Sequence, residues 1–258
     1  MRFIGTSFTA FFCALIFAIS PVAAQDQGPV PLVIEADEKL EWNQEARYYL
    51  AVGNALAEQG AQTIKAGRIQ AFYNSEDEGG DITHMHADGA VSITDGVQSA
   101  RGDKLIYDVA AGSYILTGTD LVVISTDATA TADEVLEYYA ADNRLIAKGD
   151  ARIALANGRV LAADDIHIQT LPDGSVEAID AMGNVEIELE NGRTASSDKA
   201  VYTEQTGLAL LTGDVTISEG ENILNGQKAE IDFNKGISRM LATGNGRVTG
   251  VFLPGGTE

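Results

Sequence analysis

The chain has 258 residues, with 38 acidic side chains against 17 basic ones and a formal net charge of −21 at pH 7. This charge argues against binding to nucleic-acid phosphates, which requires clustered lysine and arginine. The single cysteine, Cys13, provides neither a disulfide nor a cysteine metal site, and an apolar share of 45% is typical of a globular protein that needs neither.

Residues 1–24 have the pattern of a secretory signal peptide. A basic Arg2 precedes an apolar run over 8–19, and Pro21 and three small residues follow it. The apolar run is too short for a comfortable membrane span, although an uncleaved anchor is the alternative. We predict cleavage after residue 24, a lead-in over 25–30 and a secreted mature protein.

A glycine followed by alternating apolar residues recurs through the rest of the chain, as in "MGNVEIELENG" and "TGDVTISEG". Successive copies lie 29 to 36 residues apart, and this self-similarity indicates a repeat architecture. The recurring glycines are Gly53, Gly89, Gly118, Gly149, Gly183, Gly213 and Gly244.

A second marker, an aspartate, keeps the same period. Because it recurs once per repeat, we interpret it as a structural group that caps a turn rather than as a catalytic carboxylate. The marker residues are Asp37, Asp103, Asp133, Asp164 and Asp198, with Gly67 and Gln227 at the same place in two repeats.

Within each repeat the hydrophobic period is two, which is typical of strands with one buried face. Turn dipeptides follow the first strand of several repeats, at Asp95-Gly96, Asn157-Gly158, Asn191-Gly192 and Glu219-Gly220. Such pairs favour two-residue hairpins between antiparallel strands. Even "ADEVLEYYA", which has some helical character, aligns with strands in the other repeats.

We therefore predict an all-β fold, an elongated twisted antiparallel jelly roll of about seven 30-residue repeats, with a parallel β-helix as the alternative. One domain is expected over 31–252, followed by a flexible tail over 253–258. Two loop-like insertions, "NSEDEGGD" at 74–81 and "QTLPDGS" at 169–175, lengthen single repeats.

The sequence indicates no catalytic, metal or cofactor site. His84 and His86 share a strand face but lack further ligands, and Glu76, Asp77 and Glu78 lack the spacing of a calcium loop. One aromatic residue per repeat is expected to pack in the core, with a ligand contact possible for some; these are Trp42, Phe72, Tyr107, Tyr138, Tyr202 and Phe233.

The repeated pattern Gly-x-Val-x-Ile, followed by an Ala-Asp pair and a strand that ends in an aromatic, resembles the OstA-like domain of the LptA family of periplasmic lipopolysaccharide-transport proteins. The residues that carry it span 89–107, 118–138, 149–168, 183–202 and 213–233. This resemblance implies a V-sectioned jelly roll that holds lipopolysaccharide acyl chains between its sheets. It also implies head-to-tail self-association and binding to related jelly-roll domains of inner-membrane and outer-membrane partners.

The expected function is therefore non-enzymatic transport of lipopolysaccharide from the inner to the outer membrane, contributing to outer-membrane assembly. The alternatives are a secreted β-helix that acts on polysaccharide as an adhesin or lyase, and a periplasmic scaffold with a dry core. In the transport interpretation the apolar face of each first strand lines the lipid path. The predicted lining residues are Val91, Ile93, Ile153, Val185, Ile187, Val215 and Ile217.

Overall fold

The computed structural model describes residues 30–74, 81–126, 128–156, 158–172, 174–189, 192–243 and 247–253. The predicted signal peptide, the acidic residues Glu76, Asp77 and Glu78, and the tail beyond residue 253 lie outside these ranges. Within them, no helix has the length and apolar character needed to cross a membrane.

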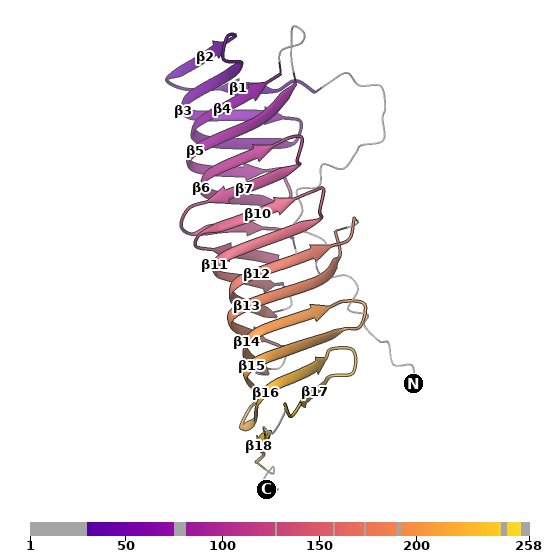
Figure 1. Cartoon of the computed structure of the whole chain (residues 1–258). Coiled ribbons are helices and arrows are strands. Elements are labelled where there is room, and N and C mark those ends of the chain that lie inside the picture. Colours follow the sequence, from indigo (N-terminus) through magenta and orange to yellow (C-terminus); the bar gives the residue numbers. More distant parts are fainter. Residues whose placement is uncertain are drawn as a thin grey trace, which may run out of the picture. The chain divides into compact units, whose positions relative to one another are not determined.

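The described chain divides into two compact units. Figure 1 labels most of their strands. We call residues 30–126 and 131–145 the N-terminal unit, and residues 128–130 and 146–253 the C-terminal unit. The strands of the N-terminal unit are β1 (Val33–Glu35), β2 (Lys39–Asn43), β3 (Tyr48–Gln59), β4 (Gln62–Tyr73), β5 (Ile82–Thr94), β6 (Ser99–Asp108), β7 (Ser113–Thr117), β8 (Leu121–Ile124) and β10 (Val135–Tyr139).

The C-terminal unit is built in the same way. It contains most of β11 (Arg144–Leu155), then β12 (Val160–Thr170), β13 (Val176–Glu188), β14 (Thr194–Thr203), β15 (Leu208–Glu219), β16 (Asn222–Asp232), β17 (Ile237–Met240) and β18 (Thr249–Val251). The remaining strand, β9 (Ala128–Ala132), contributes residues to both units.

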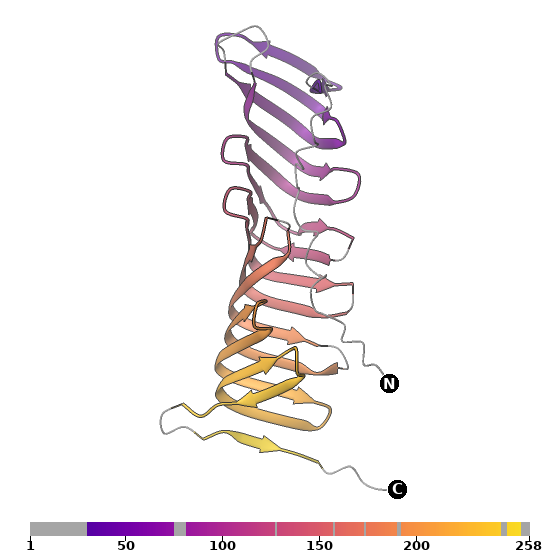
Figure 2. The same ribbon diagram turned by 90° about the vertical axis from the view of Figure 1, so that its right-hand side faces the viewer.

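Consecutive long strands pair in antiparallel register, as β3 to β6 do in the N-terminal unit and β12 to β16 in the C-terminal unit (Figure 2). Tight turns join them at predicted positions such as Asp95-Gly96 and Glu219-Gly220. The segment with helical character forms β10, which pairs antiparallel with β7. The predicted antiparallel jelly roll is therefore confirmed within each unit, and the parallel β-helix is not supported.

Alternate long strands, among them β3, β5, β13 and β15, are divided into two arms by a bulge at the recurring glycine. In β15 the pairing with β16 passes from Thr212–Lys228 to Val215–Gly226, so that β15 contains one extra residue. Gly213 and Asp214 both have positive φ, at 79° and 40°. A bulge of this kind bends a strand, and a positive φ strongly favours glycine. The repeated glycine thus marks the corner at which the chain turns from one sheet to the other.

The recurring aspartate lies against this corner from the neighbouring strand. A Cβ added to Gly213 would overlap the carboxylate of Asp198, and one added to Gly183 would overlap that of Asp164. Asp164 also accepts hydrogen bonds of 3.0 and 3.1 Å from the Asn184 side chain. The two sequence markers are therefore contact partners, and the acid serves the corner structurally.

The first and second corners of the N-terminal unit depart from this pattern. A Cβ on Gly53 would overlap Glu38 rather than the predicted Asp37, which instead accepts a 2.7 Å hydrogen bond from Asn54. At Gly89 the neighbouring position is Gly67, and a Cβ on Gly89 would lie 3.5 Å from its backbone. The repeat thus tolerates another acid or a second glycine beside the corner.

The core consists of the inward-facing side chains of the two arms. Small residues lie two positions before several corners, where the arms converge, and Ala51, Ala87, Ala147 and Ala181 are all buried there. Larger buried side chains lie opposite these small ones on the paired strand, as Ile69 does opposite Ala51, Leu105 opposite Ala87 and Ile166 opposite Ala181. At the corner Gly213 the order is reversed, because Leu211 lies two positions before it and pairs with Ala200.

Candidate ligand-binding cavity

A cavity of about 410 Å³ lies between the two arms of the C-terminal unit. Its volume falls within the range of about 300–1,000 Å³ that is typical of small-molecule sites. Both sheets contribute, and most of the side chains are aliphatic. The lining residues are Ile153, Leu155, Arg159, Val160, Leu161, Leu171, Ser175, Val176, Ile179, Ala181, Ile187, Glu188, Leu189, Ala200, Tyr202, Glu204, Ala209 and Phe233.

Two of the predicted lining residues, Ile153 and Ile187, line this cavity. Val185, Val215 and Ile217 belong to the same unit but are buried in its core, with exposed fractions of 1%, 1% and 4%. Val91 and Ile93 are buried at 1% and 4% in the N-terminal unit. All seven side chains face inward, and contact with lipid stays a prediction for each of them.

Sequence reasoning missed most of the opposite wall of the cavity, although Tyr202 and Phe233, which line it, were among the aromatic residues for which a ligand contact was expected to be possible. Ile179 and Ala181 precede the corner Gly183 in β13, and Ala200 and Tyr202 follow the marker Asp198 in β14. The burial of these segments does not alternate strictly, because Ile179 and Tyr202 are partly exposed beside partly exposed neighbours, so the period-two signal is weaker there than after each glycine.

Polar groups lie at the rim, where the strands end in turns. Arg159 closes the turn between β11 and β12, in which the Leu155 amide donates a 2.9 Å hydrogen bond to the Arg159 carbonyl. Glu188 lies 4.0 Å from Arg152 on the same sheet. On the facing arm, the Tyr202 hydroxyl donates a 2.5 Å hydrogen bond to Glu204. The cavity therefore combines an apolar body with a charged mouth.

The Tyr202 hydroxyl remains protonated well into the alkaline range. Burial raises its pKa first, and the adjacent Glu204 carboxylate raises it further, because both disfavour the phenolate. The positive charge of Arg159 opposes this shift. Arg159, on one arm, thus acts electrostatically on a group of the other arm.

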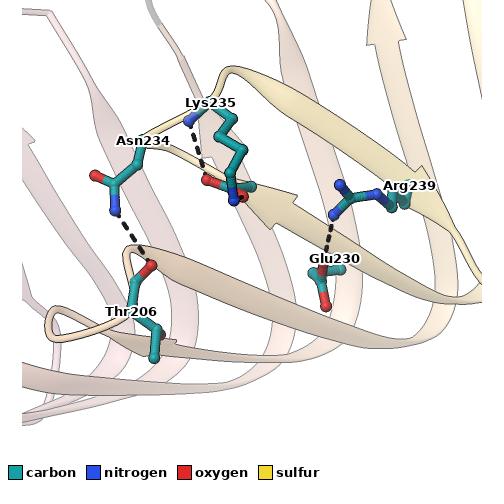
Figure 3. A network of polar contacts seen from close by, with 6 residues as sticks. Thr206, Glu230, Asn234, Lys235 and Arg239 are labelled. Carbon is teal, nitrogen blue, oxygen red and sulfur yellow. Dashed lines mark hydrogen bonds and ion pairs between the residues drawn. The ribbon is translucent and has the colours of Figure 1, made fainter.

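Phe233, which lines the cavity, lies in the turn between β16 and β17. Figure 3 shows the polar contacts that Asn234 and Lys235 make in this turn. Asp232, which is 2% exposed, accepts hydrogen bonds of 3.0 Å from the Lys235 amide and 2.8 Å from its ammonium group. Asn234 donates a 3.2 Å hydrogen bond to the carbonyl of Thr206 in the equivalent turn one repeat earlier. This network fixes Phe233, whose ring meets that of Tyr202 edge-on at 5.5 Å.

In the N-terminal unit, tyrosines fill the corresponding inner face. Tyr107 stacks on Tyr114 with ring centroids 4.2 Å apart, and Tyr138 follows at 6.4 Å on the other side of Tyr114. Burial raises the pKa of Tyr114 strongly, and the neighbouring Tyr107 raises it further. The polar side chain of Gln62, in β4, acts against this increase of the pKa.

The expectation that one aromatic residue per repeat packs in the core is wrong at two positions. Trp42 is 61% exposed on the short strand β2. Phe72 lies on the outer face, stacked on His84 at 4.2 Å, because the alternation set by the buried residues Ile69 and Ala71 turns Tyr73 inward instead. His86 joins this outer cluster, 5.5 Å from both rings. Across the described ranges, no group of three or more potential metal ligands gathers.

A bent two-layered β-fold with an apolar cavity between its layers defines a class of proteins that can enclose a hydrophobic ligand. The family of LptA/LptD N-terminal domain lipopolysaccharide transport proteins matches the chain twice, over residues 33–143 and 131–237. Together these matches cover most of the sequence. The chain belongs to this family, and it is a lipopolysaccharide transport protein.

One similar solved structure is that of LptH, the LptA-homologous periplasmic component of the conserved lipopolysaccharide transport device of Pseudomonas aeruginosa. It is 12% identical, and the alignment covers 87% of this chain and 96% of LptH with a TM-score of 0.23. A likeness of this size supports no conclusion, so the assignment rests on the family match. No curated protein sequence matches the chain.

Proposed function

We propose that the chain carries lipopolysaccharide by enclosing acyl chains in the cavity between the two arms of its C-terminal unit. The observation that supports this most directly is the composition of the lining, in which thirteen of the eighteen residues are Ala, Val, Ile, Leu or Phe. Burying an acyl chain against such a surface is favourable by about 0.8 kcal/mol for each methylene group. A polar ligand of the same size gains far less there.

The proposal also states where the protein acts and which part of the lipid it binds. After removal of residues 1–24 the protein acts in the periplasm, and it binds and passes on lipid without chemical change. Its acidic surface keeps it soluble and repels exposed phosphate groups. The acyl end of the lipid is therefore the part that enters the protein.

The proposal also includes end-to-end contacts that make a bridge between the membranes. β1 and β2 are short strands that pair with β3, and β17 and β18 are short strands that pair with β16. Edge strands offer unpaired backbone groups that can add a strand from another chain. Apolar side chains are exposed beside them, including Leu40 at 59%, Val251 at 51% and Phe252 at 67%. Other copies and jelly-roll domains of the transport machinery are the partners proposed.

Purification from a Gram-negative host tests this function. The protein is extracted from the periplasm, delipidated, and assayed for its bound hydroxylated fatty acids and for rebinding of labelled lipopolysaccharide. We expect lipopolysaccharide to co-purify and to rebind in competition with single-chain amphiphiles. A folded protein that neither retains nor rebinds lipid supports the dry-core scaffold, and depolymerisation of polysaccharide supports the enzymatic alternative.

A further inference from the structure

The polar groups of the cavity in the C-terminal unit are unevenly charged. Among the described residues that line it, Arg159 is the one cation, and Glu188 and Glu204 are the two anions. All three lie at the mouth, at or beside strand ends, while the body is apolar. An occupant that fits this pattern has a hydrocarbon chain and a polar head.

Arg159 is held in position by its backbone. The Gly158 and Leu155 amides donate hydrogen bonds of 2.9 Å within the turn, to the carbonyls of Leu155 and Arg159 respectively. The side chain is only partly exposed, and its charge acts on Tyr202 of the facing arm. A positive charge therefore lies across the opening through which a chain would enter.

The two carboxylates of the mouth have partners of their own. Glu188 is 4.0 Å from Arg152, and Glu204 accepts the 2.5 Å hydrogen bond from Tyr202. In a protein with a net charge of −21, an anionic head meets repulsion everywhere except beside a local cation. A guanidinium group binds phosphate or carboxylate with two parallel charge-assisted hydrogen bonds, so it also fixes the orientation of the head.

We infer that Arg159 is the residue that selects and orients the lipid, by holding a phosphate group of its head at the mouth while an acyl chain occupies the cavity. This inference rests on the proposed function and adds to it a direction of entry and a preference for anionic heads. Without Arg159, the remaining glutamates at the mouth repel the same head.

Paired amphiphiles with one alkyl chain and different heads test the inference. Dodecyl phosphate and dodecyl maltoside, both below their micelle concentrations, compete with a fluorescent fatty acid for the purified protein. The variants are R159Q, R159K and R193Q. Arg193 is the matched control, because it closes the next turn of the same kind, where the Leu189 amide donates a 2.8 Å hydrogen bond to its carbonyl, yet it does not line the cavity.

We expect R159Q to weaken dodecyl phosphate binding by about tenfold and to leave dodecyl maltoside binding unchanged. R159K is expected to retain part of the preference, and R193Q all of it. Equal weakening of both ligands by R159Q, or no effect on the phosphate, overturns the inference while leaving the proposed function intact. If neither amphiphile binds the wild-type protein, the proposed function fails as well. If R159Q does not fold, R159K and R193Q still test the inference. Loss of the preference for dodecyl phosphate in R193Q contradicts the role assigned to Arg159.

Discussion

The two units share one repeat but fill its interior differently. Tyr114 in the N-terminal unit and Ala209 in the C-terminal unit lie at the same place, four residues before a recurring glycine. Tyr114 pairs across the sheet with Tyr107, and Ala209 pairs with Tyr202. The first pair is a stacked core, whereas the second borders a cavity. In a repeat protein, the size of one inward-facing side chain thus helps to decide whether the interior is filled or open.

Replacing Tyr114 with alanine is expected to have the largest effect, on the stability of the N-terminal unit. The change removes the central ring of the stack, and we expect the free energy of unfolding to fall by about 3–4 kcal/mol. Urea denaturation measures the loss. Tyr139→Ala is the control, since Tyr139 faces outward toward Arg144 and its removal is expected to cost only about 1 kcal/mol. Equal losses for the two variants contradict the role assigned to the stack.

The corner glycines give the next largest effect. Gly213→Ala combines a positive φ with overlap of Asp198 and is expected to lower stability by about 3 kcal/mol, compared with about 1–2 kcal/mol for Gly89→Ala. Asp198→Gly copies the Gly67 arrangement of the N-terminal unit, and a double-mutant cycle with Gly213→Ala should recover part of the loss. Strict additivity in that cycle means that the marker and the corner glycine do not interact.

The substitution Ala209→Tyr gives the C-terminal unit the side chain that the N-terminal unit has at the equivalent position, Tyr114. The cavity has room for part of the ring, so stability should change by less than about 1.5 kcal/mol while lipopolysaccharide binding weakens at least about tenfold. Thermal melting and the labelled-lipid assay measure the two effects. Ala229→Tyr, at a buried position that does not line the cavity, should instead unfold the protein partly or wholly. Unimpaired binding by a folded Ala209→Tyr variant places the lipid elsewhere.

The smallest effect concerns alkaline pH. The pKa of Tyr114 is raised in the folded protein, so the unfolded chain loses this proton first, near pH 10. Stability from this group is therefore complete below about pH 10 and decreases as the pH rises further, by at most about 1.4 kcal/mol per pH unit. Tyr114→Phe should flatten that decrease, as followed by urea midpoints between about pH 9 and 11. An unchanged slope indicates that Tyr114 titrates normally.

Much of this fold could be predicted because its signals are local. The spacing of the glycines, the alternation within each strand and the turn dipeptides all report on residues that are neighbours in sequence. The partnership of Asp198 with Gly213 was visible as a shared period, although their contact was not. Phe72 was misplaced because the aromatic residue itself was taken as the marker of the inner face, whereas the alternation from Ile69 and Ala71 turns its neighbour Tyr73 inward.

The cavity was harder to predict, because its volume depends on side chains from two arms at once. Ile153 and Ile179 both border it, yet they lie in different strands and on opposite walls. Sequence alternation indicated which residues face inward, but not whether their summed volumes fill the space between the sheets. The cavity becomes apparent only from the strand pairing, which places Tyr202 opposite the small side chain of Ala209.

Site-specific photo-crosslinking in living cells tests the central claim most directly. A photoreactive amino acid replaces Ile187, which lines the cavity, and separately Glu186, its exposed neighbour on β13. The account predicts that lipopolysaccharide is captured from position 187 and not from position 186. Capture from neither position, or equally from both, in a normally folded protein contradicts the claim that acyl chains lie between the two arms.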